Sequence, residues 1–176
     1  MISFLKKLFT KKQKIKMIVA VDLNNGIGKN NELLFSIKKD MQHFTKKTIG
    51  NTVIMGSSTY ESIPKKYRPL KDRQNIILHK DKNPYPDEDV IVAHSIDEAI
   101  SLADKNKEVW VIGGASIYRQ MISLADELEI TQIFAQKDAD TFFPEFKNNF
   151  KLISQSEKIF DEKEKVEFQF QTWRRK

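Results

Sequence analysis

The chain has 176 residues, of which 40% are hydrophobic and 31% are charged, and this composition suits one compact domain with a sizeable apolar core. The sequence contains no cysteine, which excludes disulfides, thiolate metal sites and a cysteine nucleophile. It has neither an apolar run long enough to span a bilayer nor a secretory leader with a small-residue cleavage site. We therefore expect a cytoplasmic protein with no metal site and no integral membrane association.

The net charge of +6 is concentrated at the N-terminus. Residues 1–16 hold six lysines and no acidic residue, whereas residues 17–176 carry 24 basic and 24 acidic residues. The domain is formally neutral, so the overall charge gives no argument for a nucleic-acid partner. We expect 1–16 to be a disordered basic leader, with a weak membrane-surface helix as the alternative. Residues 17–176 are expected to form the domain, and Met17 is also a candidate alternative start.

The first predicted strand is the apolar run Met17–Val21, and the turn residues Asn24–Gly26 that follow it predict a mobile loop. A helix is expected next, with Ser36 placed to cap its N-terminus. Three apolar residues recur at offsets of four and seven and predict one apolar stripe along this helix, namely Ile37, Met41 and Phe44.

Asp40 lies within this stripe, three residues after Ile37 and four before Phe44, so its carboxylate points at whatever the apolar face covers. An unpaired charge in that position costs several kcal/mol, roughly the penalty of an uncompensated buried ion, and therefore needs a partner. Two interpretations remain open. A structural carboxylate would bond to a neighbouring backbone or arginine, and a ligand carboxylate would hold a flat nitrogen heterocycle through two parallel N–H···O bonds.

The rest of the chain first alternates strands with helices and then runs through strands alone. Strands are predicted at Thr52–Gly56, Asn75–His79, Val90–Ala93 and Glu108–Ile112, and helices at Thr59–Ile63, Ile96–Ala103 and Ser116–Ala125. Such alternation indicates crossover connections and parallel pairing. The final predicted strands are Glu127–Ala135, Lys151–Phe160 and Val166–Trp173. We expect a single-domain, mixed α/β fold with a mostly parallel central sheet flanked by helices, and antiparallel strands at the C-terminal edge.

Two predicted strands end in glycine immediately before a helix. Val53–Gly56 is followed by Ser57, Ser58 and Thr59, and Val111–Gly113 by Gly114, Ala115 and Ser116. Strand-to-helix glycines alone are a weak signal, because most of them only turn the chain. Two in one parallel sheet favour a phosphate-bearing cofactor. The motif G-x-G-x-x-G is absent, so this is not the usual dinucleotide fingerprint.

Together these segments resemble dihydrofolate reductase. The resemblance rests on I-V-A-V-D, N-G-I-G, D-M-Q-H-F, T-V-I-M-G-S-S-T-Y-E-S-I, R-Q-N-I-I-L, V-W-V-I-G-G-A-S-I-Y and D-T-F-F-P, and covers the chain from Met17 onward. It implies the fold predicted above and NADPH-dependent reduction of 7,8-dihydrofolate to 5,6,7,8-tetrahydrofolate, in support of one-carbon metabolism and thymidylate synthesis. It also implies a monomer whose partner is its small-molecule substrate.

The resemblance implies a set of substrate contacts. Asp40 would be the catalytic residue, holding the 2-amino and N3 positions of the pterin, with Thr131 hydrogen-bonded behind it. Arg73 would pair with the glutamate carboxylate, although it could equally be an ordinary surface arginine. The complete implied set is Ile18, Val19, Ala20, Asp40, Met41, Phe44, Ile63, Leu70, Arg73, Ile112 and Thr131.

A second implied set binds NADPH: Ala20, Ile27, Gly28, Gly56, Ser57, Ser58, Thr59, Leu78, His79, Lys80, Gly113, Gly114, Ala115, Ser116, Ile117 and Tyr118. The Gly113–Gly114 peptide would be cis, and Tyr118 would close the nicotinamide site, with helix packing as its alternative role. The family commonly has arginines at Ser57 and near Ser116. Lys80 is the candidate replacement for holding the ribose 2′-phosphate, or else a solvated loop lysine.

One further departure concerns the loop before the Asp40 helix, where Leu34-Phe35 stands in place of the family's usual Pro-Trp. Phe35 can preserve the apolar wall, but the indole N–H is missing. Two competing functions remain. A pyrimidinone reductase of riboflavin synthesis would need a phosphosugar site, and a non-catalytic folate- or nucleotide-binding protein is encouraged only by the lost tryptophan.

Overall fold

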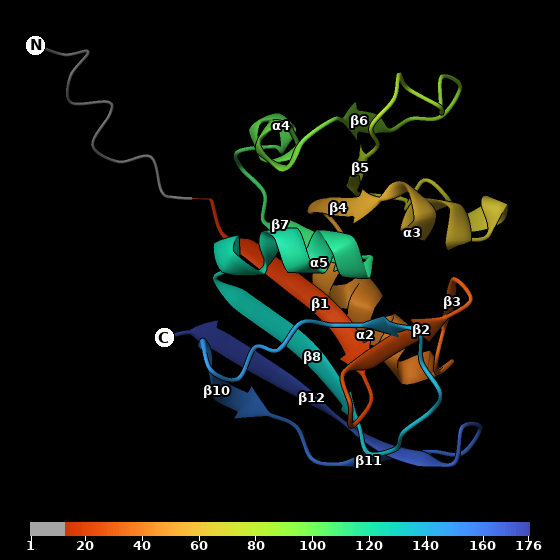
Figure 1. The fold of residues 1–176 in the computed structure, drawn as a ribbon, viewed down its shortest axis with the longest axis vertical. Helices are drawn as coiled ribbons and strands as arrows, with labels where there is room; N and C mark the ends of the chain where they lie inside the picture. Colours follow the sequence, from red (N-terminus) through yellow and green to blue (C-terminus); the bar gives the residue numbers. More distant parts are fainter. Residues whose placement is uncertain (1–12) are drawn as a thin grey trace, which may run out of the picture.

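The computed structural model describes residues 13–176, in which one large sheet forms the centre of the domain (Figure 1). Its strands pair in the order β10-β12-β8-β1-β7-β4-β5-β6, and β11 pairs with β12. In chain order these strands are β1 (Ile15–Val21), β4 (Thr52–Gly56), β5 (Gln74–Leu78), β6 (Ile91–Ala93), β7 (Val109–Gly113), β8 (Glu127–Ile133), β10 (Phe150–Gln155), β11 (Ile159–Asp161) and β12 (Val166–Arg175).

The pairing directions confirm the predicted fold. Strands β8, β1, β7, β4, β5 and β6 pair in parallel, because helical crossovers connect most of them. Strands β12, β10 and β11 pair antiparallel at the other edge, where short connections replace the crossover helices. The tail therefore forms the antiparallel edge that its sequence predicts.

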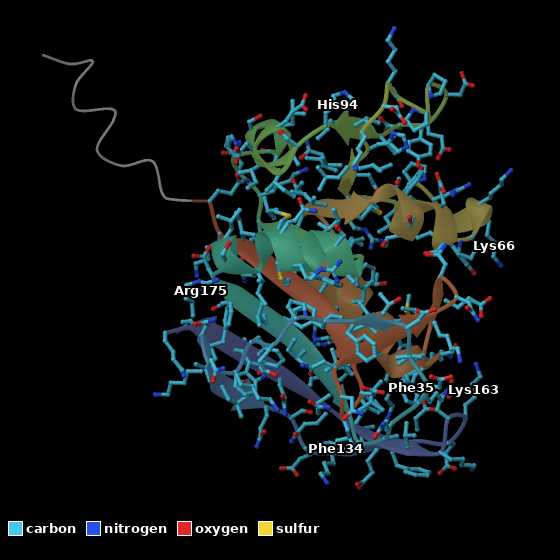
Figure 2. The ribbon with its side chains drawn as sticks, in the orientation of Figure 1. Phe35, Lys66, His94, Phe134, Lys163 and Arg175 are labelled. Carbon is cyan, nitrogen blue, oxygen red and sulfur yellow. The ribbon has the colours of Figure 1, made fainter. Side chains whose placement is uncertain are left out.

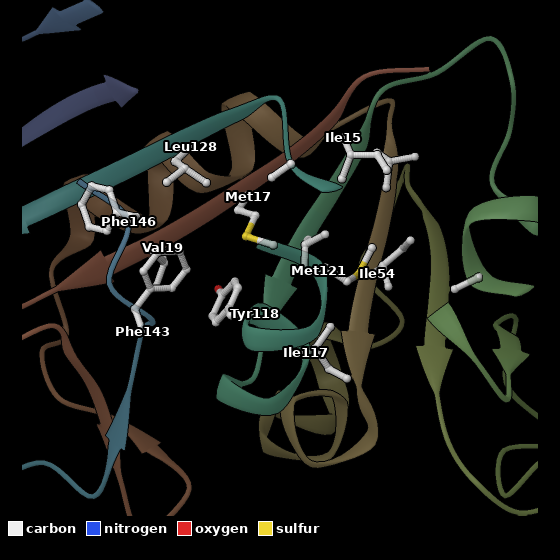
Figure 3. Packing of buried hydrophobic residues seen from close by; sticks show 14 of the residues in the cluster. Ile15, Met17, Val19, Ile54, Ile117, Tyr118, Met121, Leu128, Phe143 and Phe146 are labelled. Atoms are coloured by element: carbon white, nitrogen blue, oxygen red, sulfur yellow. The ribbon is translucent and has the colours of Figure 1, made fainter. Parts of the chain in front are cut away.

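The helices cover both faces of the sheet and define two sides of the core. On one face lie α4 (Ile96–Leu102), which packs beside β5 and β6, and α5 (Ala115–Met121). Tyr118 and Met121 of α5 share a core cluster with Met17 and Val19 of β1 (Figure 3). On the other face lie α2 (Lys38–Thr48) and α3 (Ser57–Ser62), which contribute Phe44 and Tyr60. The short helices η2 (Lys65–Tyr67) and η3 (Ile122–Leu124) complete the set within residues 13–176.

The predicted loop after β1 is in fact a β-hairpin. Strands β2 (Gly26–Lys29) and β3 (Glu32–Leu33) pair antiparallel, and β2 also pairs with β9 (Thr141–Phe142). The hairpin turns at Asn30 and Asn31, whose φ values of 51° and 62° suit a two-residue turn with positive φ at both positions. The sequence analysis missed this hairpin because its strands are short and contain glycine and charged residues.

Several predicted boundaries are wrong by a few residues or by one element. Strand β1 begins at Ile15, two residues before the predicted start at Met17. Gln13 is also fixed, because its Nε2 donates to the carbonyls of Asp104 at 2.7 Å and Lys107 at 3.0 Å. Residues 13–16 of the predicted leader thus belong to the domain, and 1–12 lie outside the described residues.

In the second half of the chain, two predicted elements are each divided in the structure. The predicted strand Lys151–Phe160 is two strands, β10 and β11, separated by residues 156–158. The predicted helix Ser116–Ala125 is α5 followed by η3. Among the described residues, no helix is long and apolar enough to cross a bilayer.

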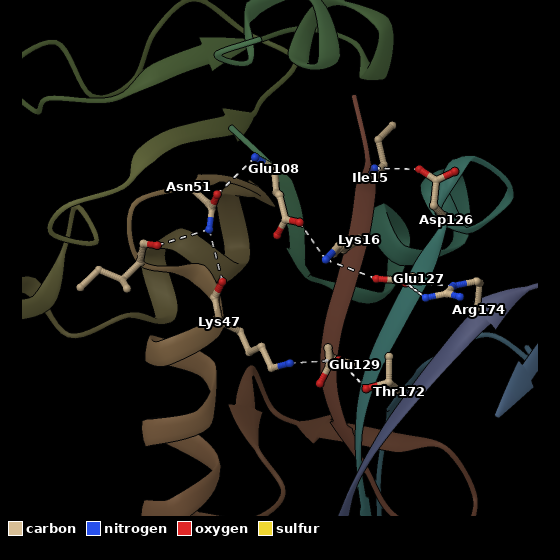
Figure 4. A network of polar contacts seen from close by, with 11 residues as sticks. Ile15, Lys16, Lys47, Asn51, Glu108, Asp126, Glu127, Glu129, Thr172 and Arg174 are labelled. Carbon is tan, nitrogen blue, oxygen red and sulfur yellow. Dashed lines mark hydrogen bonds and ion pairs between the residues drawn. The ribbon is translucent and has the colours of Figure 1, made fainter. Parts of the chain in front are cut away.

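A network of charged side chains joins β1, β8, β12 and the residue that precedes β7 (Figure 4). Lys16 on β1 lies 2.8 Å from Glu108 and 3.3 Å from Glu127, and Arg174 on β12 approaches Glu127 at 2.9 Å. Burial raises the pKa of Glu127, but hydrogen bonds from Arg174 and Lys16 outweigh it and leave that pKa below its usual range. The first strand is therefore held at its N-terminal end by charge as well as by apolar packing.

Candidate active site

Helix α2 carries Asp40, and its N-terminus differs from the prediction. The helix begins at Lys38, its capping residue is Ile37, and no side chain caps it. Ser36 does not act as the cap, because its N–H donates to Glu164 Oε1 at 2.8 Å and its hydroxyl accepts from Lys163 Nζ at 3.2 Å. Figure 2 shows Lys163 beside Phe35 in this region.

Within residues 13–176, one carboxylate oxygen of Asp40 accepts a hydrogen bond and the other accepts none. Thr131 on β8, itself buried, donates its hydroxyl to Asp40 Oδ1 at 2.6 Å, and no other residue within 13–176 donates a hydrogen bond to this carboxylate. Burial raises the pKa of Asp40, while the Thr131 hydrogen bond and the charge of His43 oppose that rise. No arginine or backbone N–H in the described part of the chain pairs with the carboxylate, as the structural interpretation would require. This geometry favours the ligand carboxylate.

Tyr118 on α5 connects the core to the strand below Asp40. Its hydroxyl donates to the carbonyl of Ile18 at 2.8 Å, and its ring meets Phe143 edge to face at 4.9 Å between centroids. Burial and the nearby charge of Asp40 both raise the pKa of the phenol. Tyr118 therefore has the helix-packing role given as its alternative, and it also lies close enough to Asp40 for that charge to affect its pKa. Its predicted place at the nicotinamide site stays a prediction.

The three β1 residues predicted to floor the substrate site do not share a face. Ile18 packs with the α2 and α3 side of the core, and Ala20 packs with Phe35 and Ile37. Val19 points into the opposite core, against Tyr118 and Phe143 (Figure 3). Because side chains alternate along a strand, only the backbone of Val19 can face a ligand beside Asp40.

Four of the predicted substrate contacts pack together on the α2 and α3 side of the sheet, and one does not. The four are half-buried members of a single apolar cluster, namely Phe44, Ile63, Leu70 and Ile112. Met41 is the exception, because it is 48% exposed and lines a shallow hollow on the outer side of α2 with Lys38 and Ile49. The predicted apolar stripe is therefore wrong at Met41, which the helix turns toward solvent.

Arg73 is not an ordinary surface arginine. Its Nη1 donates to the hydroxyl of Thr48 at 3.1 Å and its Nε donates to the carbonyl of Lys71 at 3.0 Å. The guanidinium carbon lies 5.9 Å from the ring centroid of Phe44, and burial lowers the pKa of the group. Arg73 thus occupies the C-terminal end of α2, on the same side as Phe44, where it remains the predicted carboxylate partner.

The two glycine-ended strands lie side by side, as a shared phosphate site requires. Strands β4 and β7 pair in parallel with Met55 opposite Gly113, and the Gly113–Gly114 peptide is cis, as expected. A Cβ added to Gly56 would approach Ile117 Cγ1 at 3.2 Å, and one added to Gly114 would lie 3.1 Å from Thr59 Oγ1. Bare backbone therefore lines the adjoining strand ends, and these residues fit the pyrophosphate of a dinucleotide.

The neighbouring strand ends extend this edge with polar side chains. Gly56, Leu78 and Ala93 end β4, β5 and β6 and are paired in register, so Ser57, His79 and His94 follow at adjacent positions. His94 Nδ1 lies 3.0 Å from the carbonyl of His79, to which it can donate, and Lys80 is exposed next to it. The sequence analysis missed His94 (labelled in Figure 2), although it directly follows the predicted strand Val90–Ala93 and His79 ends the predicted strand Asn75–His79.

The β2–β3 hairpin, which contains the predicted cofactor contacts Ile27 and Gly28, is fixed at its base. Asp22, which is buried, accepts the backbone N–H groups of Asn24 at 2.8 Å and Gly26 at 2.7 Å through Oδ1. Its Oδ2 accepts the N–H of Lys137 at 3.2 Å. At the tip, Asn31 Nδ2 reaches the carbonyl of Ser58 on α3 at 3.5 Å. The hairpin therefore spans from β1 to the first turn of α3.

The Leu34-Phe35 segment keeps an apolar wall, as predicted. Phe35 is 8% exposed and packs with Ile37, Ile133 and Phe168. Lys137 fixes the segment, because its ammonium lies 4.1 Å from the Phe35 ring centroid and donates to the carbonyl of Leu34 at 2.7 Å. The ring thus has defined neighbours without the hydrogen-bonding nitrogen of a tryptophan.

A mostly parallel α/β sheet with a half-buried carboxylate on one helix, and with two adjoining strands that end in glycine, is the arrangement expected of a nucleotide-cofactor oxidoreductase. The chain belongs to the dihydrofolate reductase family, whose family model matches residues 14–175. This membership confirms the resemblance drawn from the sequence motifs.

Individual relatives agree with the family assignment over nearly the whole chain. The dihydrofolate reductase of Staphylococcus haemolyticus is 35% identical over 92% of this chain and 96% of its own, and that of Bacillus subtilis is 35% identical over 92% and 95%. A solved structure of dihydrofolate reductase from Enterococcus faecalis, complexed with NADP(H) and RAB-propyl, has a TM-score of 0.81. That chain is 33% identical, and the match covers 92% of this chain and 96% of the other.

Proposed function

We propose that the chain catalyses NADPH-dependent reduction of 7,8-dihydrofolate to 5,6,7,8-tetrahydrofolate, the reaction that supports one-carbon metabolism and thymidylate synthesis. The observation that carries the proposal is the state of Asp40. One oxygen is engaged by Thr131 at 2.6 Å, the other accepts no hydrogen bond within residues 13–176, and Phe44, one turn along α2, packs in an apolar cluster. Such a carboxylate is suited to bind the amino and N–H edge of a pterin.

The surrounding residues supply orientation for the substrate. Phe44, Ile63 and Leu70 present one apolar surface next to α2, on which the pterin and aminobenzoyl rings would pack. Arg73, at the far end of the helix, would pair with the glutamate carboxylate through its planar guanidinium. The carboxylate of Asp40, the apolar surface around Phe44 and the cation of Arg73 follow one another along α2. Their order would match the pterin, the aminobenzoyl ring and the glutamate carboxylate of dihydrofolate.

The glycine strand ends are the proposed cofactor site. Gly56, Gly113 and Gly114 would allow the pyrophosphate to approach the backbone, with the Thr59 hydroxyl beside them. Bound NADPH supplies the hydride that the reduction needs. The hairpin that contacts Ser58 would cover this edge and exclude water from it.

The protein has to deliver one proton to the substrate in addition to the hydride. If Asp40 holds the 2-amino and N3 edge, its carboxylate is too far from the opposite edge of the ring to protonate it there. We therefore assign proton delivery to a water, and to Asp40 the role of polarising and orienting the ring.

The same proposal includes a monomeric state and a cytoplasmic location. Size-exclusion chromatography with light scattering measures the oligomeric state, and fractionation of the native host measures the location.

Purified protein mixed with dihydrofolate and NADPH, and followed at the nicotinamide absorbance, tests the activity. The proposal expects oxidation of NADPH that depends on dihydrofolate and is lost in Asp40→Asn. Binding of both ligands without turnover would instead identify a non-catalytic binding protein. Turnover only with a pyrimidinone phosphosugar would identify a riboflavin-pathway reductase.

A further inference from the structure

His43 lies one turn after Asp40 on α2 and is fixed by two contacts with the sheet. Its ring stacks on Phe170 of β12, with centroids 4.0 Å apart and planes 17° from parallel. Its Nε2 lies 3.2 Å from Glu129 Oε2 on β8. The side chain is 17% exposed, so its position is set by contacts with the sheet.

Glu129, the partner of His43, is a buried carboxylate that the surroundings keep ionised. Thr172 donates its hydroxyl to Glu129 Oε1 at 2.7 Å, and Lys47 Nζ lies 3.3 Å from the same oxygen (Figure 4). Burial raises the pKa of Glu129, but hydrogen bonds from His43 and Thr172 and the charge of Lys47 outweigh it and leave the pKa lowered. His43 therefore faces a negative charge.

Two polar contacts of the same kind join α2 to β8. Asp40 meets Thr131 at 2.6 Å and His43 meets Glu129 at 3.2 Å. Residues two apart on a strand share a face, as do residues three apart on a helix, so the contacts lie beside each other. Together they fix both the rotation of α2 about its axis and its position along β8.

We propose that His43 is a positioning residue for Asp40, which ties α2 to β8 and, when protonated, places a positive charge one helical turn from the carboxylate. The charged and titratable groups around this pair are Lys47 on α2, Glu129 on β8, and Tyr118, which faces Asp40 from α5. The consequence for pterin binding rests on the proposed function, whereas the coupling between the two side chains does not.

The direction of the coupling follows from charge. Burial raises the pKa of Asp40, and the charge on His43 lowers it. A positive charge on His43 favours the ionised carboxylate, so His43 opposes the effect of burial on Asp40.

The test is the titration midpoint of the Asp40 side chain, measured by carboxyl ¹³C NMR without substrate or cofactor. His43→Gln keeps a donor for Glu129 but has no charge, and His43→Phe keeps the stack on Phe170. In both variants we expect the midpoint to rise by about 0.5–2 pH units. This range assumes unit charges on residues 40 and 43 about 6 Å apart, the usual spacing of side chains one helical turn apart. Its lower end applies the dielectric constant of water and its upper end that of a protein surface. The acid limb of the pH profile of kcat/KM for dihydrofolate should move to higher pH by the same amount.

Lys39→Gln is the matched control, because it removes a solvent-exposed cation adjacent to Asp40 in the sequence. We expect no shift of the midpoint in this variant. An unchanged midpoint in folded His43→Gln, or an equal shift in Lys39→Gln, would overturn the proposal. Because the NMR titration requires no turnover, failure of the coupling and failure of the proposed reductase activity are separate results.

Discussion

Replacing Asp40 by asparagine is the most direct test of the site, and its effect can be estimated from the hydrogen bond to Thr131. That hydroxyl donates to Oδ1 at 2.6 Å, so the asparagine carbonyl would accept this bond and the amide N–H₂ would face the ligand. The pterin edge would then meet donors in place of acceptors. Losing two charge-assisted hydrogen bonds of about 1.5–3 kcal/mol each removes about 3–6 kcal/mol. We expect kcat/KM to fall by about 10²- to 10⁴-fold, at about 1.4 kcal/mol per tenfold change.

The same substitution should leave stability unchanged or increase it at neutral pH. Burial raises the pKa of Asp40, so the native state binds the carboxyl proton more tightly than the unfolded chain does. The ionised group consequently lowers the free energy of unfolding above its folded pKa. The stability advantage of Asp40→Asn should therefore be present at neutral pH and shrink as the pH falls toward the ordinary aspartate value of about 4.

Steady-state kinetics with dihydrofolate and NADPH, together with urea unfolding at neutral and acidic pH, measure both effects. Lys39→Asn, on the exposed side of the same helix, is the matched control and should change neither. Activity of Asp40→Asn within a few-fold of the unmodified protein, with an unchanged unfolding curve, would refute the role assigned to Asp40.

Three further predictions use other parts of the structure. Removal of residues 1–12 should leave kcat/KM unchanged, whereas removal of 1–16 should lower the unfolding midpoint, because β1 begins at Ile15. A 13–176 protein that is folded but inactive would show that residues 1–12 contribute to the active site. NADPH should be preferred over NADH, and Lys80→Ala should raise the KM for NADPH alone, with Lys82→Ala as the control; equal loss with both cofactors would exclude Lys80 from the 2′-phosphate site. Hydrogen bonds and Lys47 lower the pKa of Glu129 despite its burial. The ionised Glu129 should thus stabilise the fold above the ordinary glutamate pKa, and this contribution should be lost as the pH falls through the pKa of the folded state. In urea unfolding, the free energy of unfolding of Glu129→Gln should therefore fall less steeply with decreasing pH than that of the unmodified protein.

The sequence by itself determined the order and direction of the main strands. Apolar runs ending in glycine and followed by helical patterns are local signals, and β4 spans Thr52–Gly56 as predicted. The sequence also predicted the unusual placement of Asp40 among apolar residues, because helical periodicity depends only on residue spacing. Family motifs then supplied the reaction, which composition and periodicity could not.

Apart from the Asp40–Thr131 contact, which the family resemblance implied, only the tertiary structure decided which side chains meet across the sheet. Along the sequence, Thr131 is 91 residues from Asp40 and His43 is 86 residues from Glu129, so no local sequence pattern predicts either contact. Whether Met41 faces the core or solvent depends on how α2 is rotated against β8, and that rotation is fixed by those two long-range contacts. Periodicity identifies a face of a helix, but only packing against distant strands determines what that face touches.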